Sequence, residues 1–295
     1  MQLKPHNQFK IRALIKEGEY LLADGPYAER ASLDAEALML HILQRDAPER
    51  NRSWLIAHRN SHVMPPARKE FEALVARRLA GVPMQYITGE AEFFGLPFAV
   101  ASGVLIPRPE TEHLVEEVIR LAAAITEPRI ADIGTGSGAI SVALAHSLPL
   151  ARITATDLSP QALAIARQNA VRNSVEDRIE FFEGDLLAPL AGQSFYIIAS
   201  NPPYVPLLDR DSLSIEVRDH EPHSALFAGD DGLSIYRRLI PEARKSLVPG
   251  GWLVMEIGYG QQPAIEQLML TNGWEEVHFI ADYQGIPRVA VGLRD

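Results

Sequence analysis

Asp132-Ile133-Gly134-Thr135-Gly136-Ser137-Gly138 is the stretch of sequence that decides the fold. It stands between an apolar segment, 129–133, and a helical segment, 139–147. Glycines at such a junction let the backbone turn tightly and approach a ligand without Cβ clashes. The helix that follows has free N–H groups in its first turn. The stretch therefore predicts a ligand-binding loop at the carboxyl end of a strand.

Outward from this loop, apolar segments alternate with helical ones, which indicates a parallel sheet covered by helices on both faces. The last two strands have no helix between them, so they predict a hairpin that places one antiparallel strand in the sheet. The predicted strands are 129–133, 151–156, 178–182, 195–200, 252–257, 275–281 and 288–293, and the predicted helices are 139–147, 160–172, 232–247 and 261–271.

A carboxylate at the end of the second strand indicates nucleotide binding. Asp157 follows Gly138 by 19 residues, where a carboxylate can accept both ribose hydroxyls of an adenosine. The loop also matches Gly-x-Gly-x-x-Ala through Ala139, so a dinucleotide dehydrogenase stays open on this motif alone. Asp132 argues against it, because a carboxylate there would repel a pyrophosphate but could accept the ammonium of a methionine moiety. Asp185, which ends the third strand, is either an adenine contact or an ordinary loop aspartate.

Ser200-Asn201-Pro202-Pro203-Tyr204 follows the fourth strand, so it lies over the same edge of the sheet. An amide nitrogen is a poor nucleophile because its lone pair is delocalised into the carbonyl. The Asn201 side-chain oxygen and the Pro202 carbonyl can bind its two protons and aim the lone pair at a methyl donor, with proline fixing both acceptors. Tyr204 can pack on the flat amide and line the path of a sulfonium. Catalysis would then rest on positioning and electrostatics.

Residues 1–80 predict short helices without any strand pattern. We expect the adjacent Arg77 and Arg78 on a solvated helix face. Residues 83–110 hold a hairpin around a Gly-Leu-Pro turn and a proline-rich lead into a helix, so we place the domain boundary there. The expected apolar faces are Phe9, Leu14, Ile15, Tyr20 and Leu21, then Leu33, Ala37, Leu40 and His41, then Phe71, Leu74, Val75 and Leu79.

Composition excludes several classes of function. The chain has no cysteine, which rules out disulfides and thiolate chemistry, and its nine histidines show no metal-ligand spacing, so we expect no metal. Its net charge of −10 disfavours binding of duplex DNA through the phosphates and favours a basic protein partner. It has neither a secretory signal nor an apolar run that could span a membrane. We therefore expect a cytoplasmic protein without a direct nucleic-acid or membrane partner. We also expect a monomer, although the sequence does not give the oligomeric state.

The loop 132–138, Asp157 and the Asn-Pro-Pro-Tyr motif together resemble the amino-methyltransferases of the Rossmann-like class I fold, which use S-adenosylmethionine (SAM). Further motifs narrow this to a resemblance to the release-factor glutamine methyltransferases, the PrmC/HemK family. The resemblance covers nearly the whole chain and is weakest in residues 1–80. The further motifs are 106–112, 221–227, 229–233, 249–253, 256–258, Asp282 and Arg288.

This resemblance implies an α/β class I methyltransferase sheet with a small N-terminal helical domain. The implied domains are 1–82, which recognises the substrate, 83–110, the hairpin and linker, and 111–295, which binds SAM. The implied reaction methylates N5 of the glutamine in the Gly-Gly-Gln motif of class I peptide chain release factors. The implied cofactor-binding residues are Asp132, Gly134, Thr135, Gly136, Ser137, Gly138, Asp157, Asp185, Leu186 and Asn201, and the implied catalytic and substrate-binding residues are Asn201, Pro202, Pro203 and Tyr204.

Several alternatives stay open. A glutamine methyltransferase acting on a ribosomal protein shares most of these motifs, and so does a DNA adenine N6-methyltransferase, which would also need a basic groove. A non-catalytic release-factor binder would not need the intact Asn-Pro-Pro-Tyr motif. Arg108 and Glu110 either shape the substrate entrance or brace the linker, and we expect a structural role for Glu221. Two departures from the family are Tyr283-Gln284 and Leu186-Leu187, and the second leaves the adenine contact undefined.

Overall fold

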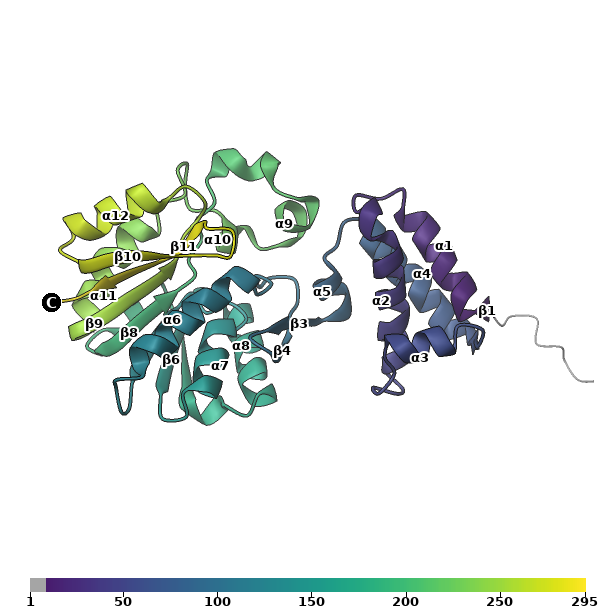
Figure 1. The fold of residues 1–295 in the computed structure, drawn as a ribbon, viewed down its shortest axis with the longest axis horizontal. Coiled ribbons are helices and arrows are strands. Elements are labelled where there is room, and N and C mark those ends of the chain that lie inside the picture. The colour runs from purple at the N-terminus through teal and green to yellow at the C-terminus, as the bar shows by residue number, and fades with distance from the viewer. Residues whose placement is uncertain (1–8) are drawn as a thin grey trace, which may run out of the picture. The chain divides into compact units, whose positions relative to one another are not determined.

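The structure, a computed structural model, describes residues 9–295 (Figure 1), so the first eight residues of the predicted 1–82 domain lie outside the described residues. The chain divides into two compact units. The described part of the first unit is 9–89 together with Ser214–His220, and the second consists of Glu90–Leu213 and Glu221–Asp295. The segment Ser214–His220, which the sequence assigns to 111–295, therefore belongs to the helical unit.

The first unit is a helical bundle around one apolar core. The sequence predicts no strand here, yet β1 (Phe9–Lys10) pairs with β2 (His62–Val63). Two residues are too few for the alternation of a strand to show in a sequence. The helices are α1 (Ile11–Leu22), α2 (Ala31–Gln44), α3 (Arg52–Ala57), α4 (Pro65–Leu79), α5 (Met84–Thr88) and α9 (Ile215–His220), with a 3₁₀ turn at Ala28–Arg30.

A buried ion pair joins α2 to α4 and corrects one expectation. Arg78, expected on a solvated face, is 2% exposed, and its Nε donates to Asp34 Oδ2 at 2.6 Å. Its Nη1 also pairs with Glu216 of α9, and its guanidinium lies over the Tyr27 ring. Because the buried face of α2 turns toward Asp34, the expected core residue Leu33 is 55% exposed.

The second unit is built on a seven-stranded sheet of order β10-β11-β9-β8-β5-β6-β7. β11 alone runs antiparallel to the other six strands, which confirms the predicted α/β class and the final hairpin. The strands are β5 (Arg129–Ile133), β6 (Arg152–Asp157), β7 (Ile179–Glu183), β8 (Phe195–Ser200), β9 (Leu247–Glu256), β10 (Glu275–Ala281) and β11 (Pro287–Leu293).

Helices cover both faces of this sheet (Figure 1). Successive strand residues alternate between two cores, as Ile197 and Ile198 do, because side chains along a strand point to opposite faces. One core packs against α6 (Glu112–Ala122), α7 (Ala139–Ser147) and α8 (Pro160–Arg172), and the other against α11 (Tyr236–Ser246) and α12 (Gln262–Thr271).

The remaining elements of this unit precede α6 or lie in the connections between the strands and helices. In the predicted hairpin the turn is Phe94-Gly95, with positive φ at both residues, so Leu96 and Pro97 belong to the second strand. These elements are β3 (Glu90–Phe93), β4 (Leu96–Ala99), α10 (His223–Leu226) and the 3₁₀ turns Pro109–Thr111, Glu176–Arg178, Ala188–Leu190 and Leu207–Ser212.

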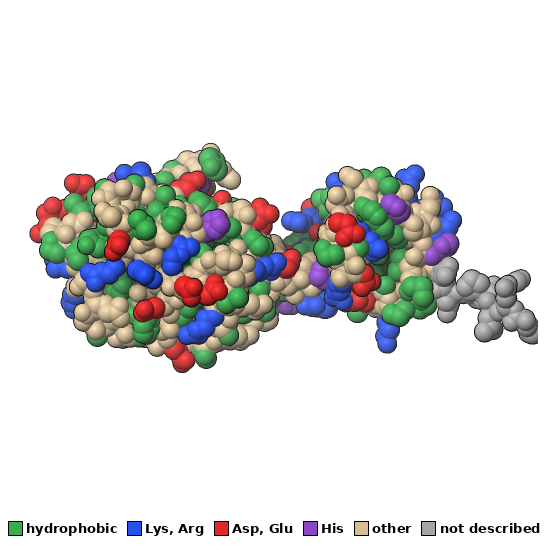
Figure 2. Space-filling model, turned by 90° about the horizontal axis from the view of Figure 1, so that it is seen from below, with side chains coloured by type: hydrophobic (Ala, Val, Ile, Leu, Met, Phe, Trp, Pro, Cys, Tyr) green, Lys and Arg blue, Asp and Glu red, His purple; other side chains and the backbone are tan. Residues whose placement is uncertain are grey.

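The surface of the described residues carries charges of both signs. On the face that Figure 2 shows, acidic and basic side chains are interspersed rather than gathered by sign. Within residues 9–295, every helix is too short or too polar to cross a membrane.

Candidate active site

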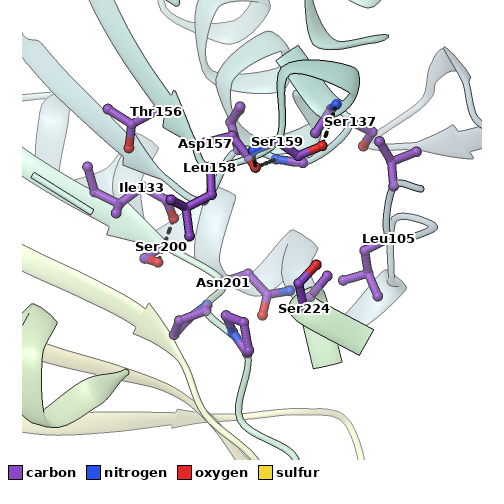
Figure 3. Close-up of a pocket in the computed structure, with 18 of the residues that line it drawn as sticks. Leu105, Ile133, Ser137, Thr156, Asp157, Leu158, Ser159, Ser200, Asn201 and Ser224 are labelled. Carbon is purple, nitrogen blue, oxygen red and sulfur yellow. Dashed lines mark hydrogen bonds between the residues drawn. The ribbon is translucent and has the colours of Figure 1, made fainter. Parts of the chain in front are cut away.

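A cavity in the second unit opens where β5, β6, β7 and β8 end at their carboxyl edge. Asp157 and Leu158 lie on one side of it, and Asn201 and Ser224 lie on the other (Figure 3). Three of the predicted site residues, Asp132, Gly138 and Tyr204, lie outside its lining. The predicted residues that line it are Gly134, Thr135, Gly136, Ser137, Asp157, Asp185, Leu186, Asn201, Pro202 and Pro203.

The glycine loop forms one wall of the cavity. The backbone N–H groups of Gly134 and Thr135 both donate to the Thr156 carbonyl at 2.9 Å, which ties the loop to β6. A Cβ on Gly134 or Gly136 would meet no atom within 4 Å, so the backbone there is open to a ligand. A Cβ on Gly138 would instead lie 3.1 Å from that of Ala166 in α8. Two glycines thus open the cavity, and the third lets two helices approach closely.

Asp132 lies beneath this loop and is fully buried. Its Oδ2 accepts hydrogen bonds from Thr135 Oγ1 at 2.7 Å and from Ser141 Oγ at 2.6 Å. Burial raises the pKa of Asp132 to about 6, although these bonds favour the ionised form. Its Oδ1 has no hydrogen-bond partner among the described residues, which is costly for a buried carboxylate. An ammonium group of a ligand, reached through water, would satisfy that oxygen.

Asp157, the last residue of β6, lines the cavity beside the glycine loop. Its Oδ2 accepts from the Gly136 N–H and its Oδ1 from the Ser159 N–H, each at 2.8 Å. Each oxygen keeps a further lone pair, so the carboxylate can still bind the two hydroxyls of a ribose. Burial raises the pKa of Asp157 above its ordinary value, against the effect of these backbone bonds.

Asp185 and Leu186 follow β7 at the edge of the cavity. Asp185 pairs with Arg238, another lining residue, at 2.5 Å. Leu186 has a φ of +47°, an uncommon conformation for a residue with a side chain, and its carbonyl accepts from Thr156 Oγ1 at 3.0 Å. The hydrogen bond to β6 holds this backbone in place beside the cavity.

Asn201 is the first residue of the Asn-Pro-Pro-Tyr corner, the segment 201–204 that follows β8. Its Nδ2 donates to Thr111 Oγ1 at 3.0 Å, and Thr111 donates to Glu256 Oε2 at 2.5 Å. The Tyr204 hydroxyl donates to the other oxygen of Glu256, at 3.1 Å, while its ring packs against an apolar core. Burial, with the nearby Glu256 charge, raises the pKa of Tyr204 far above its ordinary value. Tyr204 therefore braces the corner from behind.

Motifs with no assigned role in the sequence turn out to support this corner. A Cβ on Gly232 would lie 2.3 Å from the Tyr204 carbonyl, so only glycine fits there. That carbonyl accepts from Gln261 Nε2 at 3.0 Å. Val205 exchanges backbone hydrogen bonds with Leu226 and Ala228. The segments 226–232 and 256–261 thus hold the backbone just after the Asn-Pro-Pro-Tyr motif.

Arg108 lines the cavity and pairs with the buried Glu221 at 2.6 Å, rather than with Glu110. Arg288 donates to Asp282 Oδ2 at 3.0 Å, which fixes the turn between β10 and β11. The sequence predicts no site role for several lining residues, although Thr111 and Ser224 lie inside the motifs 106–112 and 221–227. These include Leu105, Thr111, Leu158, Ser159 and Ser224.

The comparisons with known proteins agree with this geometry. Residues 13–89 match the family model PrmC N-terminal domain, and 111–215 match Methyltransferase small domain. The chain is 42% identical to a release factor glutamine methyltransferase of Koribacter versatilis, over 89% of this chain and 91% of that protein. It is 41% identical to one of Geobacter sulfurreducens, over 92% of each. The chain belongs to the release factor glutamine methyltransferase family.

Solved structures support the fold of this family member. The hMettl16 catalytic domain, solved in complex with an RNA hairpin, matches with a TM-score of 0.56 at 17% identity over 86% of this chain and 91% of that chain. A 16S rRNA methyltransferase of T. thermophilus, RsmC, solved with AdoMet and guanosine, matches with a TM-score of 0.51 at 17% identity over 70% of this chain and 50% of that one. Both likenesses bear on the fold alone and confirm the class I methyltransferase sheet.

Proposed function

We propose that this chain transfers a methyl group from SAM to N5 of the glutamine in the Gly-Gly-Gln motif of class I peptide chain release factors. The observation that carries the proposal is the Asn201 amide, which lies across the cavity from Asp157. Its nitrogen donates to Thr111, and its oxygen accepts no hydrogen bond from residues 9–295, so a substrate can use it. Relatives at about 40% identity bear the corresponding name.

The cofactor end of the cavity suits SAM, which supplies an electrophilic methyl group on a sulfonium. Asp157 would accept the two ribose hydroxyls, and the open backbone at Gly134 and Gly136 would lie against the methionine part. Asp132 would act on the ligand ammonium through water, since it lies beneath the lining. Asp185 and Leu186 would contact the adenine end.

The substrate end presents two oxygen acceptors, so no basic group has to take a proton before the methyl group moves. Transfer breaks the bond between sulfur and methyl and forms the bond from nitrogen to methyl. S-adenosylhomocysteine then leaves, and the proton lost by the methylated amide passes to water. The Asn201 oxygen and the Pro202 carbonyl would bind both N–H protons of the glutamine amide, which turns the nitrogen lone pair toward the methyl group. Pro202 and Pro203 limit the motion of these acceptors, so part of the cost of orientation is met before the substrate binds. Tyr204 would contribute by holding the corner, because its hydroxyl is committed to Glu256.

We propose that the helical domain, 1–82, contacts the release factor, and that the enzyme acts as a cytoplasmic monomer without a direct nucleic-acid partner. Its net charge of −10 suits a basic protein partner.

The proposal is tested by incubating the enzyme with isotopically labelled SAM and purified class I release factor. We expect label in the wild-type factor and none in a factor whose Gly-Gly-Gln glutamine is replaced by alanine. Ribosomal proteins and adenine-containing duplex DNA are tested in parallel. Label that persists in the alanine factor, or that enters only ribosomal protein or DNA, would contradict the proposed substrate.

A further inference from the structure

Glu256 is a buried carboxylate directly behind the Asn-Pro-Pro-Tyr corner. It is the last residue of β9 and is 2% exposed. Its two oxygens accept hydrogen bonds from different residues: Oε1 from Tyr204 and Oε2 from Thr111. Thr111 in turn accepts a hydrogen bond from Asn201. One side chain therefore connects to both ends of the motif.

The chemistry of these three side chains determines which atom donates and which accepts in each hydrogen bond. Burial raises the pKa of Glu256, whereas the hydrogen bonds from Thr111 and Tyr204 favour its ionised form. In that form the carboxylate can only accept hydrogen bonds, and a threonine hydroxyl has a single proton to give. Because Thr111 gives that proton to Glu256, its oxygen can only accept from Asn201. The Asn201 group facing Thr111 must therefore be the NH₂, and the amide oxygen must point away from Thr111.

Without such a constraint an asparagine amide has two orientations of almost equal shape. A half-turn exchanges oxygen and nitrogen with little change in packing. In the flipped orientation Asn201 would offer N–H groups to the N–H groups of the substrate amide. No hydrogen bond would form, and the substrate nitrogen would lose one of the two acceptors that orient it.

We propose that Glu256 is a positioning residue which, through Thr111, turns the Asn201 oxygen toward the substrate amide. This inference rests on the proposed function, because it assumes that the substrate offers an NH₂ group. It adds two residues, Thr111 and Glu256, that act on the reaction through Asn201 and touch neither reacting atom.

The direct test compares Thr111→Val with Thr111→Ser in methylation of the release factor. Valine keeps the shape of threonine and loses the hydroxyl, whereas serine keeps the hydroxyl and loses a methyl group. We expect Thr111→Val to lower kcat by about tenfold or more and Thr111→Ser to stay within about threefold of wild type. SAM affinity and melting temperature are measured for each, and we expect SAM affinity to change little.

A purely structural role for Thr111 predicts the reverse order, because valine fills the buried site and serine leaves a gap. Near-normal kcat in Thr111→Val, or a larger loss in Thr111→Ser, would overturn the inference. Wild-type enzyme that methylates no release factor would instead contradict the proposed function, so the two failures can be told apart.

A second comparison tests Glu256 itself. Glu256→Gln keeps the shape of the side chain but can donate to Thr111 and so allows the reverse direction of bonding. We expect a several-fold lower kcat in Glu256→Gln and most of that loss to vanish in the Thr111→Val background, since residues in one network couple. Losses that multiply fully in the double variant would show that Glu256 does not act through Thr111.

Discussion

The backbone N–H of Gly136 donates a hydrogen bond of 2.8 Å to Oδ2 of Asp157. The glycine loop and the carboxylate that ends β6 therefore support each other directly, although the two residues lie 21 positions apart in the chain. Asp157 shapes the wall of the cavity as well as facing into it. Its replacement should disturb both the ligand contact and the loop.

We expect Asp157→Ala to weaken SAM binding by at least about tenfold, because a hydrogen bond to a charged acceptor is worth roughly 1.5–3 kcal/mol. Titration calorimetry with SAM measures the effect. Asp231→Ala, which removes an exposed carboxylate paired with Arg237, is the matched control and should bind SAM normally. Unchanged affinity in Asp157→Ala would remove Asp157 from the proposed ribose site.

Asn201→Ala should lower the rate of methyl transfer by roughly 10²–10³-fold, the usual cost of losing one oriented polar group in an active site. Most of the SAM affinity should remain, because the other proposed cofactor contacts lie across the cavity. Single-turnover kinetics and SAM titration separate the two effects. Asn272→Ala, at the end of α12, is the control. Near-normal turnover in Asn201→Ala would show that the amide takes no part.

Gly138→Ala should destabilise the protein more than Gly285→Ala does. The two glycines have φ of +81° and +79°, so alanine pays a similar backbone cost of about 1–2 kcal/mol at each. Only at Gly138 would the new Cβ press on α8, which adds roughly 1–3 kcal/mol of overpacking. Chemical denaturation gives both values, and equal losses would argue against close packing of the loop on α8.

The buried Asp132 should make stability depend on pH in a definite direction. With its folded pKa raised to about 6, the native state holds a proton that the unfolded chain has lost between about pH 4 and pH 6. The free energy of unfolding of wild type, minus that of Asp132→Asn, should therefore fall as pH rises through this window, by at most about 3 kcal/mol. A difference that stays constant or rises with pH would show that the pKa of Asp132 is not raised in the folded protein. Denaturant unfolding at several pH values supplies the comparison.

Much of the second unit could be predicted from the sequence. The bounds of β5, α7, α8 and β8 agree with the predicted segments, because glycine, proline or a capping residue flanks each of them. β9 begins at Leu247 rather than 252, since Pro249-Gly250-Gly251 lies inside the strand at an irregular register with β8. Such a tripeptide is typical of a loop, so the local pattern was misleading there.

Long-range polar pairing could not be predicted in the same way. Arg78 and Asp34 are buried together, whereas a hydrophobic pattern predicts charged side chains on the solvent-exposed face of a helix. Thr111 and Glu256 are 145 residues apart, and only the fold brings them together behind Asn201. The sequence therefore indicated which residues face the cavity more readily than which residues hold them.

The central claim is that Asn201 and Pro202 present a glutamine amide to the methyl group of SAM. Tandem mass spectrometry of release factor after incubation with enzyme and SAM tests it most directly. We predict one added methyl group, located on the side-chain nitrogen of the Gly-Gly-Gln glutamine, and its loss with the Asn201→Ala enzyme. A methyl group on another residue, or an unmodified glutamine after prolonged incubation with active enzyme, would contradict the account.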